Sequence, residues 1–299
     1  MRFEPKGIIP PIVTPLNPDE TLNEPVLRQL VNHFIAQGVH GLFPVGTTGE
    51  FYGLSEEEFD RIIRIVVEET AGRVPVYAGC NSIATKNVVR LVKMAKAAGA
   101  DAVSVLTPMF VSQTQAEIYE YYRAIAEESE LPVVIYNNRP KTNVMVNPET
   151  VARLAELPQI VGVKDSTGDM TNTGEYIRLT RHIEGFSVLV GRDTLILSGL
   201  HYGAKGAIAS CANIAPRLVA DIYEKFMAGD YEGALEDQFR LAPLRLACNM
   251  GSFPAVIKEG LCYEGFNVGK CMNPIQELTA PEKEKLYAII RDIQPAGVN

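Results

Sequence analysis

Lys164 stands directly after the apolar run Ile160–Val163, in a segment typical of a buried strand. Burial removes water from an ammonium group and disfavours its charged form, so the pKa of such an amine falls. A neutral amine attacks a ketone to form an imine, which then acts as an electron sink for a neighbouring carbon–carbon bond. The pattern predicts Schiff-base chemistry on a 2-oxo acid such as pyruvate. The alternative is a strand-end lysine whose stem lies on apolar surface while its charge stays in water.

Tyr136 ends the preceding apolar run, Pro132–Tyr136. Neighbouring strands lie about 4.8 Å apart, and side chains alternate along each strand. We therefore expect Val134 and Tyr136 to face the same interior as Gly162 and Lys164, with the glycine leaving room for the lysine stem. The residues expected to face outward, against helices, are Val133, Ile135, Val161 and Val163. A phenol beside the amine could shuttle a proton to and from a substrate; the alternative is a core tyrosine with a satisfied hydroxyl.

The segment Gly46–Glu50 has the sequence Gly-Thr-Thr-Gly-Glu and follows another apolar run. Backbone N–H groups in a turn of this kind can form a concavity that binds an anion. A 2-oxo acid needs such a cradle for the carboxylate next to its ketone, so Gly46, Thr47 and Thr48 are candidate binding residues. No Gly-Lys-Ser/Thr follows, so the segment is not a nucleotide-binding P-loop. The alternative is an ordinary turn between a strand and a helix.

These residues must be positioned by a repeated pattern of short apolar strands and longer amphipathic helices. The predicted strands are Ile8–Thr14, Gly41–Val45, Val74–Ala78, Ala102–Leu106, Pro132–Tyr136, Ile160–Lys164, Ser187–Val190 and Gly206–Ser210. The predicted helices are Leu22–Gln37, Ser55–Thr70, Ala84–Ala98, Thr114–Glu130, Pro148–Glu156, Thr171–Arg181, Thr194–Tyr202 and Ala215–Met227. Ser55, with Glu58 three residues later, is typical of a capped helix start.

Eight strands alternating with eight helices predict an α/β fold, a (β/α)8 TIM barrel, with residues 1–228 forming the barrel. Residues 229–299 carry helical patterns and are expected to pack on the barrel as a C-terminal helical appendage. An open doubly wound sheet would need a glycine-rich phosphate turn after the first strand, which Thr14-Pro15-Leu16 is not. Active sites of such barrels lie where the strands end, which selects Lys164 and Tyr136 and places Lys205 at the opposite mouth.

Together, Gly46-Thr47-Thr48-Gly49-Glu50, Tyr136-Asn137 and Val163-Lys164-Asp165 resemble the dihydrodipicolinate synthase / N-acetylneuraminate lyase family of class I aldolases. The resemblance implies that Lys164 forms the Schiff base, that Tyr136 relays protons, and that Thr47 and Thr48 hold the 2-oxo carboxylate and join the relay. It also implies that Gly191 and Ile208 are backbone positions near the site, Ile208 through its carbonyl. The resemblance further implies that this chain forms a homotetramer built as a dimer of dimers.

Two positions depart from the pattern of this family. Phe110 stands where members often carry a tyrosine that reaches into the neighbouring subunit's site, so a relay of three hydroxyls would lack one member. Lys141 aligns with an arginine that grips the carboxylate of the aldehyde in the lysine pathway, with Arg139 two residues earlier; lysine supplies charge but no bidentate fork. Arg192 and Asp193 lie where the sugar-handling members contact their aldehyde, although a loop Arg-Asp pair is often simply solvated.

The composition gives no indication of a nucleic-acid-binding, membrane-spanning or metal-binding protein. The net charge is −8, which gives no nucleic-acid signal, and no apolar run is long enough to cross a membrane. Five cysteines without a C-x-x-C pair suit free thiols in a reducing cytoplasm, and no histidine or cysteine spacing indicates a metal.

We therefore expect an enzyme without metal or organic cofactor that joins or splits a 2-oxo acid and an aldehyde, as dihydrodipicolinate synthase does. Alternatives are an aldolase or dehydratase of 2-keto-3-deoxy sugar acids and an N-acetylneuraminate lyase-like cleavage. A barrel that binds a 2-oxo acid without turnover is the non-enzymatic alternative.

Overall fold

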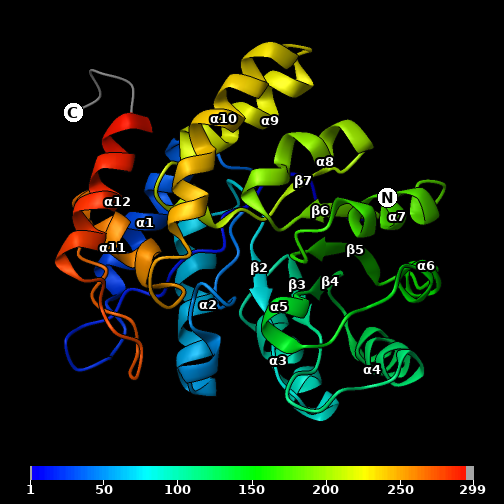
Figure 1. Ribbon diagram of the computed structural model, residues 1–299. Helices are drawn as coiled ribbons and strands as arrows, with labels where there is room; N and C mark the ends of the chain where they lie inside the picture. Colours follow the sequence, from blue (N-terminus) through cyan, green and yellow to red (C-terminus); the bar gives the residue numbers. More distant parts are fainter. Residues whose placement is uncertain (1, 294–299) are drawn as a thin grey trace.

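The computed structural model describes residues 2–293 and contains one sheet of seven parallel strands. The strands are β1 (Gly7–Ile8), β2 (Tyr77–Gly79), β3 (Ala102–Leu106), β4 (Val133–Asn137), β5 (Ile160–Asp165), β6 (Ser187–Val190) and β7 (Gly206–Ala207). Their order in the sheet is β1-β7-β6-β5-β4-β3-β2, and helices surround them (Figure 1). β1 and β7 are shorter than predicted, and Ser210–Asn213 forms a 3-10 helix instead of the end of a strand.

The predicted strand Gly41–Val45 fills the gap between β1 and β2 without regular strand geometry. Phe43 N donates to Pro10 O at 3.0 Å on one side, and Leu42 N donates to Pro75 O at 2.9 Å on the other. Prolines interrupt all three segments, and a proline supplies no N–H to a ladder, which explains why only an isolated bridge forms here. The segment still joins the two edges, so the sheet closes into the predicted (β/α)8 barrel.

Eight buried side chains, one from each segment of the ring, fill the barrel interior as a separate apolar cluster. They are Ile9, Phe43, Tyr77, Ala102, Val134, Val161, Leu189 and Ile208. The prediction that Val161 faces the helices is wrong: the β4–β5 register shifts between Val133 and Val134, so Val161 turns inward. Val133, Ile135 and Val163 pack outside the barrel as predicted.

The predicted helices form within a few residues of their expected ends. They are α1 (Glu24–Ala36), α2 (Glu56–Thr70), α3 (Thr85–Ala97), α4 (Gln115–Glu128), α6 (Pro148–Ala155), α7 (Met170–Thr180), α8 (Ile196–Tyr202) and α9 (Pro216–Met227). Ser55 and Glu58 form the predicted capping box at the start of α2. A short helix that the sequence did not predict, α5 (Arg139–Thr142), follows β4 and carries Lys141.

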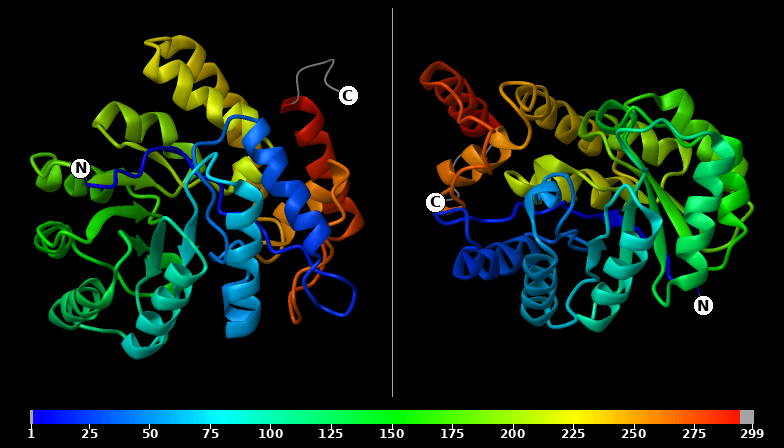
Figure 2. Two further views of the ribbon diagram at one scale, coloured as in Figure 1. Left: turned by 180° about the vertical axis from the view of Figure 1, so that it is seen from behind. Right: turned by 90° about the horizontal axis from the view of Figure 1, so that it is seen from below.

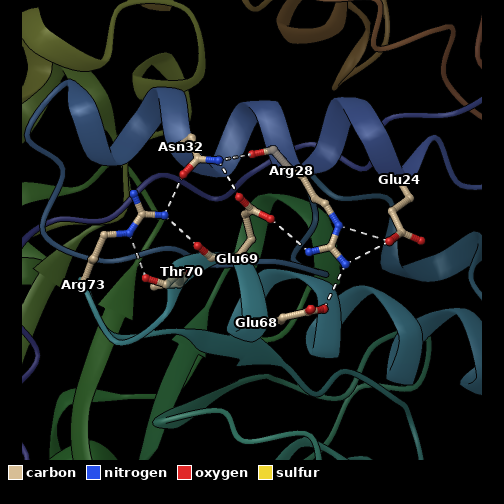
Figure 3. Close-up of polar contacts among 7 residues, drawn as sticks. All are labelled: Glu24, Arg28, Asn32, Glu68, Glu69, Thr70 and Arg73. Atoms are coloured by element: carbon tan, nitrogen blue, oxygen red, sulfur yellow. Dashed lines mark hydrogen bonds and ion pairs between the residues drawn. The ribbon is translucent and has the colours of Figure 1, made fainter.

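Ionic contacts fasten α1 to α2, the two helices that flank the Gly46–Glu50 turn along the chain. Figure 3 shows Arg28 of α1 between Glu24 of its own helix and Glu68 and Glu69 of α2, with each pair at 2.9 Å. Asn32 extends the network by donating to Glu69 and accepting from Arg73 at 2.6 Å. The network links the two helices at several points along their length. Its contribution to the free energy of unfolding is expected to be small, because exposed ion pairs stabilise a fold only weakly.

The C-terminal region consists of α10 (Tyr231–Ala247), α11 (Ala255–Tyr263) and α12 (Ala280–Ile293). α10 packs along α9, as Figures 1 and 2 show, and α12 packs against α10 and α11. The predicted division at residues 228 and 229 falls in the turn between α9 and α10, and this division stays a prediction. Within residues 2–293, no helix is both long and apolar enough to span a membrane.

One fully buried ion pair ties this region to the barrel. Lys258 Nζ of α11 lies 2.7 Å from a carboxylate oxygen of Glu50, and the two side chains are 2% and 0% exposed. The other Glu50 oxygen accepts Met272 N at 2.7 Å, and Lys258 also donates to Lys270 O at 2.8 Å. The end of the Gly46–Glu50 turn is thus held by the C-terminal region.

Replacing Lys258 with methionine leaves the Glu50 carboxylate buried without its counter-charge. We expect the free energy of unfolding to fall by about 3–5 kcal/mol, measured by urea denaturation. The matched control is Lys270→Met, because Lys270 pairs with Glu277 at the surface with 75% of its side chain exposed. That change should cost less than about 1 kcal/mol. Equal losses in the two variants would show that the buried pair does not anchor the C-terminal region.

Candidate active site

A cavity of about 100 Å³ lies where β4, β5 and β6 end. Strand ends, the loops after them, and the C-terminal region all contribute to its wall. The lining residues are Pro11, Thr47, Thr48, Tyr136, Asn138, Pro140, Lys141, Lys164, Ser166, Gly191, Arg192, Ile208, Ser210, Arg245 and Phe253. The cavity therefore lies at the end of the barrel that the sequence predicted for the chemistry.

Lys164 lies deep in this cavity, with 4% of the residue exposed. Its Nζ is 3.9 Å from the ring centroid of Tyr136 and 5.0 Å from that of Phe43. The parallel register pairs Tyr136 with Lys164 directly. Gly162 is needed for a reason other than the predicted room for the lysine stem, because a Cβ there would lie 2.6 Å from the carbonyl oxygen of Ser187 in β6.

Burial lowers the pKa of the Lys164 amine below its ordinary value. The negative charge that Tyr136 can carry, a hydrogen bond with that phenol, and the more distant Asp193 carboxylate act in the opposite direction but do not outweigh burial. The site therefore favours a neutral amine more than water does, which is the state that attacks a carbonyl.

The hydroxyl of Tyr136 forms hydrogen bonds with two polar side chains. Asn138 Nδ2 donates to Tyr136 Oη at 2.8 Å, and Thr47 Oγ1 lies 3.4 Å from the same oxygen. Burial by itself would raise the pKa of the phenol, but the Lys164 charge and the hydrogen bonds from Thr47, Lys164 and Asn138 bring it below its ordinary value. Proton exchange between this phenol and its neighbours is correspondingly easier.

The Gly46–Glu50 turn is compact because its backbone approaches neighbouring chain closely. Thr14 Oγ1 donates to Gly49 O at 2.7 Å, and a Cβ on Gly49 would lie 3.1 Å from the carbonyl oxygen of Ile12. Thr47 and Thr48 line the cavity, whereas Gly46 is buried and is not part of the lining. The turn thus brings both threonines to the cavity, and their binding of a carboxylate stays a prediction.

The other candidate residues separate into two groups. Gly191 and Ile208 are part of the wall, with Gly191 N bonded to Asp165 O at 2.7 Å, and Lys141 lines the mouth with its side chain exposed. Asp193 lies behind the wall: it accepts Cys211 N at 2.7 Å and pairs with Arg245 at 3.2 Å. The predicted contact between Asp193 and a substrate is therefore not supported. Arg245, which pairs with Asp193, lines the cavity instead.

Several cavity residues were missed by sequence reasoning. Asn138 stands two residues after Tyr136, so strand alternation could have identified it. Arg245 and Phe253 come from the C-terminal region, and no local pattern links them to the barrel. Phe110 is 93% exposed and lies outside this cavity. Within residues 2–293, no group of three or more His, Cys, Asp or Glu side chains is arranged to hold a metal ion.

Comparison with known proteins agrees with this geometry. Residues 4–293 match the profile of the Dihydrodipicolinate synthetase family. The 4-hydroxy-tetrahydrodipicolinate synthase of Hyphomonas neptunium is 41% identical over 98% of this chain and 99% of that protein. The enzyme of the same name from Syntrophus aciditrophicus is 38% identical over 96% and 98% of the two chains.

Solved structures give the same picture of the fold. Dihydrodipicolinate synthase from Thermotoga maritima superposes with a TM-score of 0.94 at 30% identity, over 98% of this chain and 99% of that one. A prophage protein of the dihydrodipicolinic acid synthase family from E. coli K12, solved in complex with pyruvate, superposes with a TM-score of 0.92 at 28% identity, over 96% and 98%.

The predicted barrel and the predicted lyase class are both confirmed by these relatives, and the non-enzymatic alternative is set aside. With nearly all of its length matched, this chain belongs to the dihydrodipicolinate synthetase family.

Proposed function

We propose that Lys164 forms a Schiff base with pyruvate or a related 2-oxo acid, and that the resulting enamine condenses with an aldehyde or arises from the reverse cleavage. The observation that carries this proposal is the buried amine, whose pKa is lowered and whose nitrogen lies 3.9 Å from the Tyr136 ring centroid. The solved relative in complex with pyruvate supports the choice of 2-oxo acid.

The neutral Lys164 amine adds to the ketone carbon, a proton passes from its nitrogen to the former ketone oxygen, and a second proton lets that hydroxyl leave as water to give the iminium. Tyr136 is the proposed donor, since its hydroxyl lies in the same cavity and its pKa is lowered. Loss of a proton from the adjacent carbon gives the enamine, which attacks the aldehyde. Thr47, 3.4 Å from the phenol oxygen, relays the proton, and hydrolysis of the final imine releases Lys164.

The carboxylate next to the ketone is proposed to lie on the Gly46–Thr48 segment. Thr48 and Thr47 offer hydroxyls to the cavity, and the backbone of the turn offers N–H donors. Gly191 and the Ile208 carbonyl border the opposite side of the cavity. This arrangement holds the 2-oxo acid with its ketone carbon toward Lys164.

The proposed overall reaction is based on the similar proteins described above. Synthesis like that of dihydrodipicolinate synthase is the favoured reaction, with cleavage or dehydration of 2-keto-3-deoxy sugar acids as the second candidate. Arg192 at the cavity wall is compatible with that second candidate, because a guanidinium donates hydrogen bonds to hydroxyl groups as well as to carboxylates. We also propose a cytoplasmic homotetramer, a dimer of dimers, in which the exposed Phe110 and Val111 lie at a subunit contact.

Borohydride trapping tests the nucleophile. With pyruvate present, reduction should attach the substrate irreversibly to the wild-type chain, as intact-protein mass spectrometry would show. Lys164→Ala should give no adduct, because no amine remains to form the imine. The matched control is Lys205→Ala, which removes a half-exposed lysine paired with Glu4 outside the cavity and should trap normally. An adduct on Lys164→Ala would exclude the proposed chemistry.

Tyr136→Phe tests the proton donor. Removing the hydroxyl should lower kcat roughly 100- to 10,000-fold, the range for loss of general acid–base catalysis, while pyruvate trapping persists at long times. Tyr122→Phe is the matched control: this buried hydroxyl donates to Val105 O at 3.0 Å, away from the cavity. Its kcat should be close to that of wild type. A Tyr136→Phe enzyme with normal turnover would remove Tyr136 from the mechanism.

The pH dependence of imine formation supplies a separate check. Since only the neutral Lys164 amine attacks, the rate of trapping should rise with pH through the pKa of this group, below the value for an exposed lysine. The charge of Tyr136 opposes the fall in that pKa, so Tyr136→Phe should move the rise to still lower pH. Stopped-flow trapping across pH would measure both curves, and a shift to higher pH would contradict the account.

A further inference from the structure

Asn138 is the N-cap residue of α5, but its side chain does not cap that helix. Asparagine is among the residues that cap a helix best, because its side-chain oxygen accepts a free backbone N–H of the first turn. Here the amide instead donates from Nδ2 to Tyr136 Oη at 2.8 Å. The residue is 7% exposed and lines the cavity. A local role in the helix therefore does not account for this side chain.

The backbone of Asn138 is held by the helix that follows it. Its carbonyl oxygen accepts Lys141 N at 2.9 Å, Thr142 N at 3.0 Å and Thr142 Oγ1 at 3.1 Å. Thr142 Oγ1 in turn accepts from Thr107 Oγ1 at 3.1 Å, in the loop after β3. The side chain of Asn138 thus extends toward the phenol from a backbone position that three hydrogen bonds hold in place.

The polar side chains around the Tyr136 hydroxyl differ in what they can do with a proton. Thr47 Oγ1, 3.4 Å away, can donate or accept, and so can the neutral amine of Lys164. The amide nitrogen of Asn138 donates only, and it does not titrate. A proton can therefore pass between Tyr136 and Thr47 or Lys164, but not between Tyr136 and Asn138.

The charge nearest in effect to the phenol is that of Lys164. This charge and the hydrogen bonds from Thr47, Lys164 and Asn138 lower the pKa of Tyr136, against the effect of burial. Further cations line the same cavity, namely Lys141, Arg192 and Arg245, and the ring of Phe43 lies edge-on to the Tyr136 ring at 6.4 Å. Asn138 contributes to the stability of the phenolate without adding a charge.

We propose that Asn138 is a positioning residue: its one-way hydrogen bond holds the Tyr136 oxygen as an acceptor and directs the phenol proton toward Thr47 and the substrate. The inference rests on the proposed function, in which Tyr136 protonates the hydroxyl that leaves from the Lys164 adduct. When the phenol O–H bond breaks, the electron pair stays on the phenol oxygen and the N–H bonds of Asn138 remain intact. Thr47 then passes back the proton that the adjacent carbon releases when the enamine forms.

Absorbance titration of the tyrosines tests this role without a substrate. Because the pKa of Tyr136 is lowered, the earliest tyrosinate band on raising the pH should come from Tyr136 and be missing in Tyr136→Phe. Asn138→Leu has nearly the same shape but no donor, so it should move this band to higher pH by roughly one to two units. Asn138→Asp replaces the donor with an acceptor and a negative charge, so it should move the band further.

Asn172→Leu is the matched control for the loss of a buried amide. Asn172 is 5% exposed, and its Nδ2 donates to Asp165 Oδ2 at 2.9 Å, outside the cavity lining. The variant removes a donor of the same kind from a site of similar burial. It should leave the tyrosinate band at the pH of the wild type.

Pyruvate trapping supplies a second readout and shows that each variant is folded. Tyr136 must carry its proton to act as a donor, so the trapping rate should fall at high pH as the phenol ionises. In Asn138→Leu this fall should move to higher pH together with the absorbance. In Asn138→Asp the phenol proton turns toward the new carboxylate, so trapping at neutral pH should slow by roughly tenfold or more.

Three titration results would overturn the inference: an unmoved band in Asn138→Leu, a band at or below the wild-type pH in Asn138→Asp, or an equal shift in Asn172→Leu. An absorbance shift that the trapping rate does not follow would overturn it as well. Each of these can occur while the wild type traps pyruvate normally, so the proposed function would survive. A wild type that traps no pyruvate would instead reject the Schiff-base function itself.

Discussion

The register that sets Tyr136 opposite Lys164 on β4 and β5 is the constraint on which the site depends. It places a phenol beside an amine inside a closed ring, where burial disfavours the ammonium form. A slip of one residue would turn one of the two side chains to the helices, because side chains alternate along a strand. The shift between Val133 and Val134 lies below this pair and therefore leaves it intact.

Closure of the barrel brings further polar groups to Lys164 and Tyr136. The segment Gly41–Val45 bonds to Pro10 and Pro75 across both edges, although the prolines prevent a regular strand. Its end carries the Gly46–Glu50 turn, and closure brings Thr47 within 3.4 Å of the Tyr136 oxygen. The buried Glu50–Lys258 pair then fixes the far end of the same turn. Irregular backbone at this position is thus compatible with a well-defined arrangement of hydroxyls.

The sequence predicts the features that depend on short stretches of the chain. Lys164 and Tyr136 each end an apolar run, so residue type and position are enough to single them out, and eight such runs predict the barrel. Prediction from the sequence fails where contacts between distant segments decide how a side chain is oriented. The inward turn of Val161 depends on a register shift with β4, and the selection of Arg245 over Asp193 at the cavity depends on how α10 packs against the barrel. Neither has a periodic signal of its own.

The C-terminal helices therefore belong to the active site as much as to the stability of the fold. α11 supplies Lys258, which neutralises the carboxylate at the end of the threonine turn, and α10 supplies Arg245 to the cavity wall. Both are cations, and both meet a buried carboxylate of the barrel, Glu50 or Asp193. Since an unpaired buried carboxylate is costly, the barrel ends could not keep this form without the helices. A barrel cut at residue 228 would lose the counter-charge of both positions, so the two parts of the chain form a single structural unit.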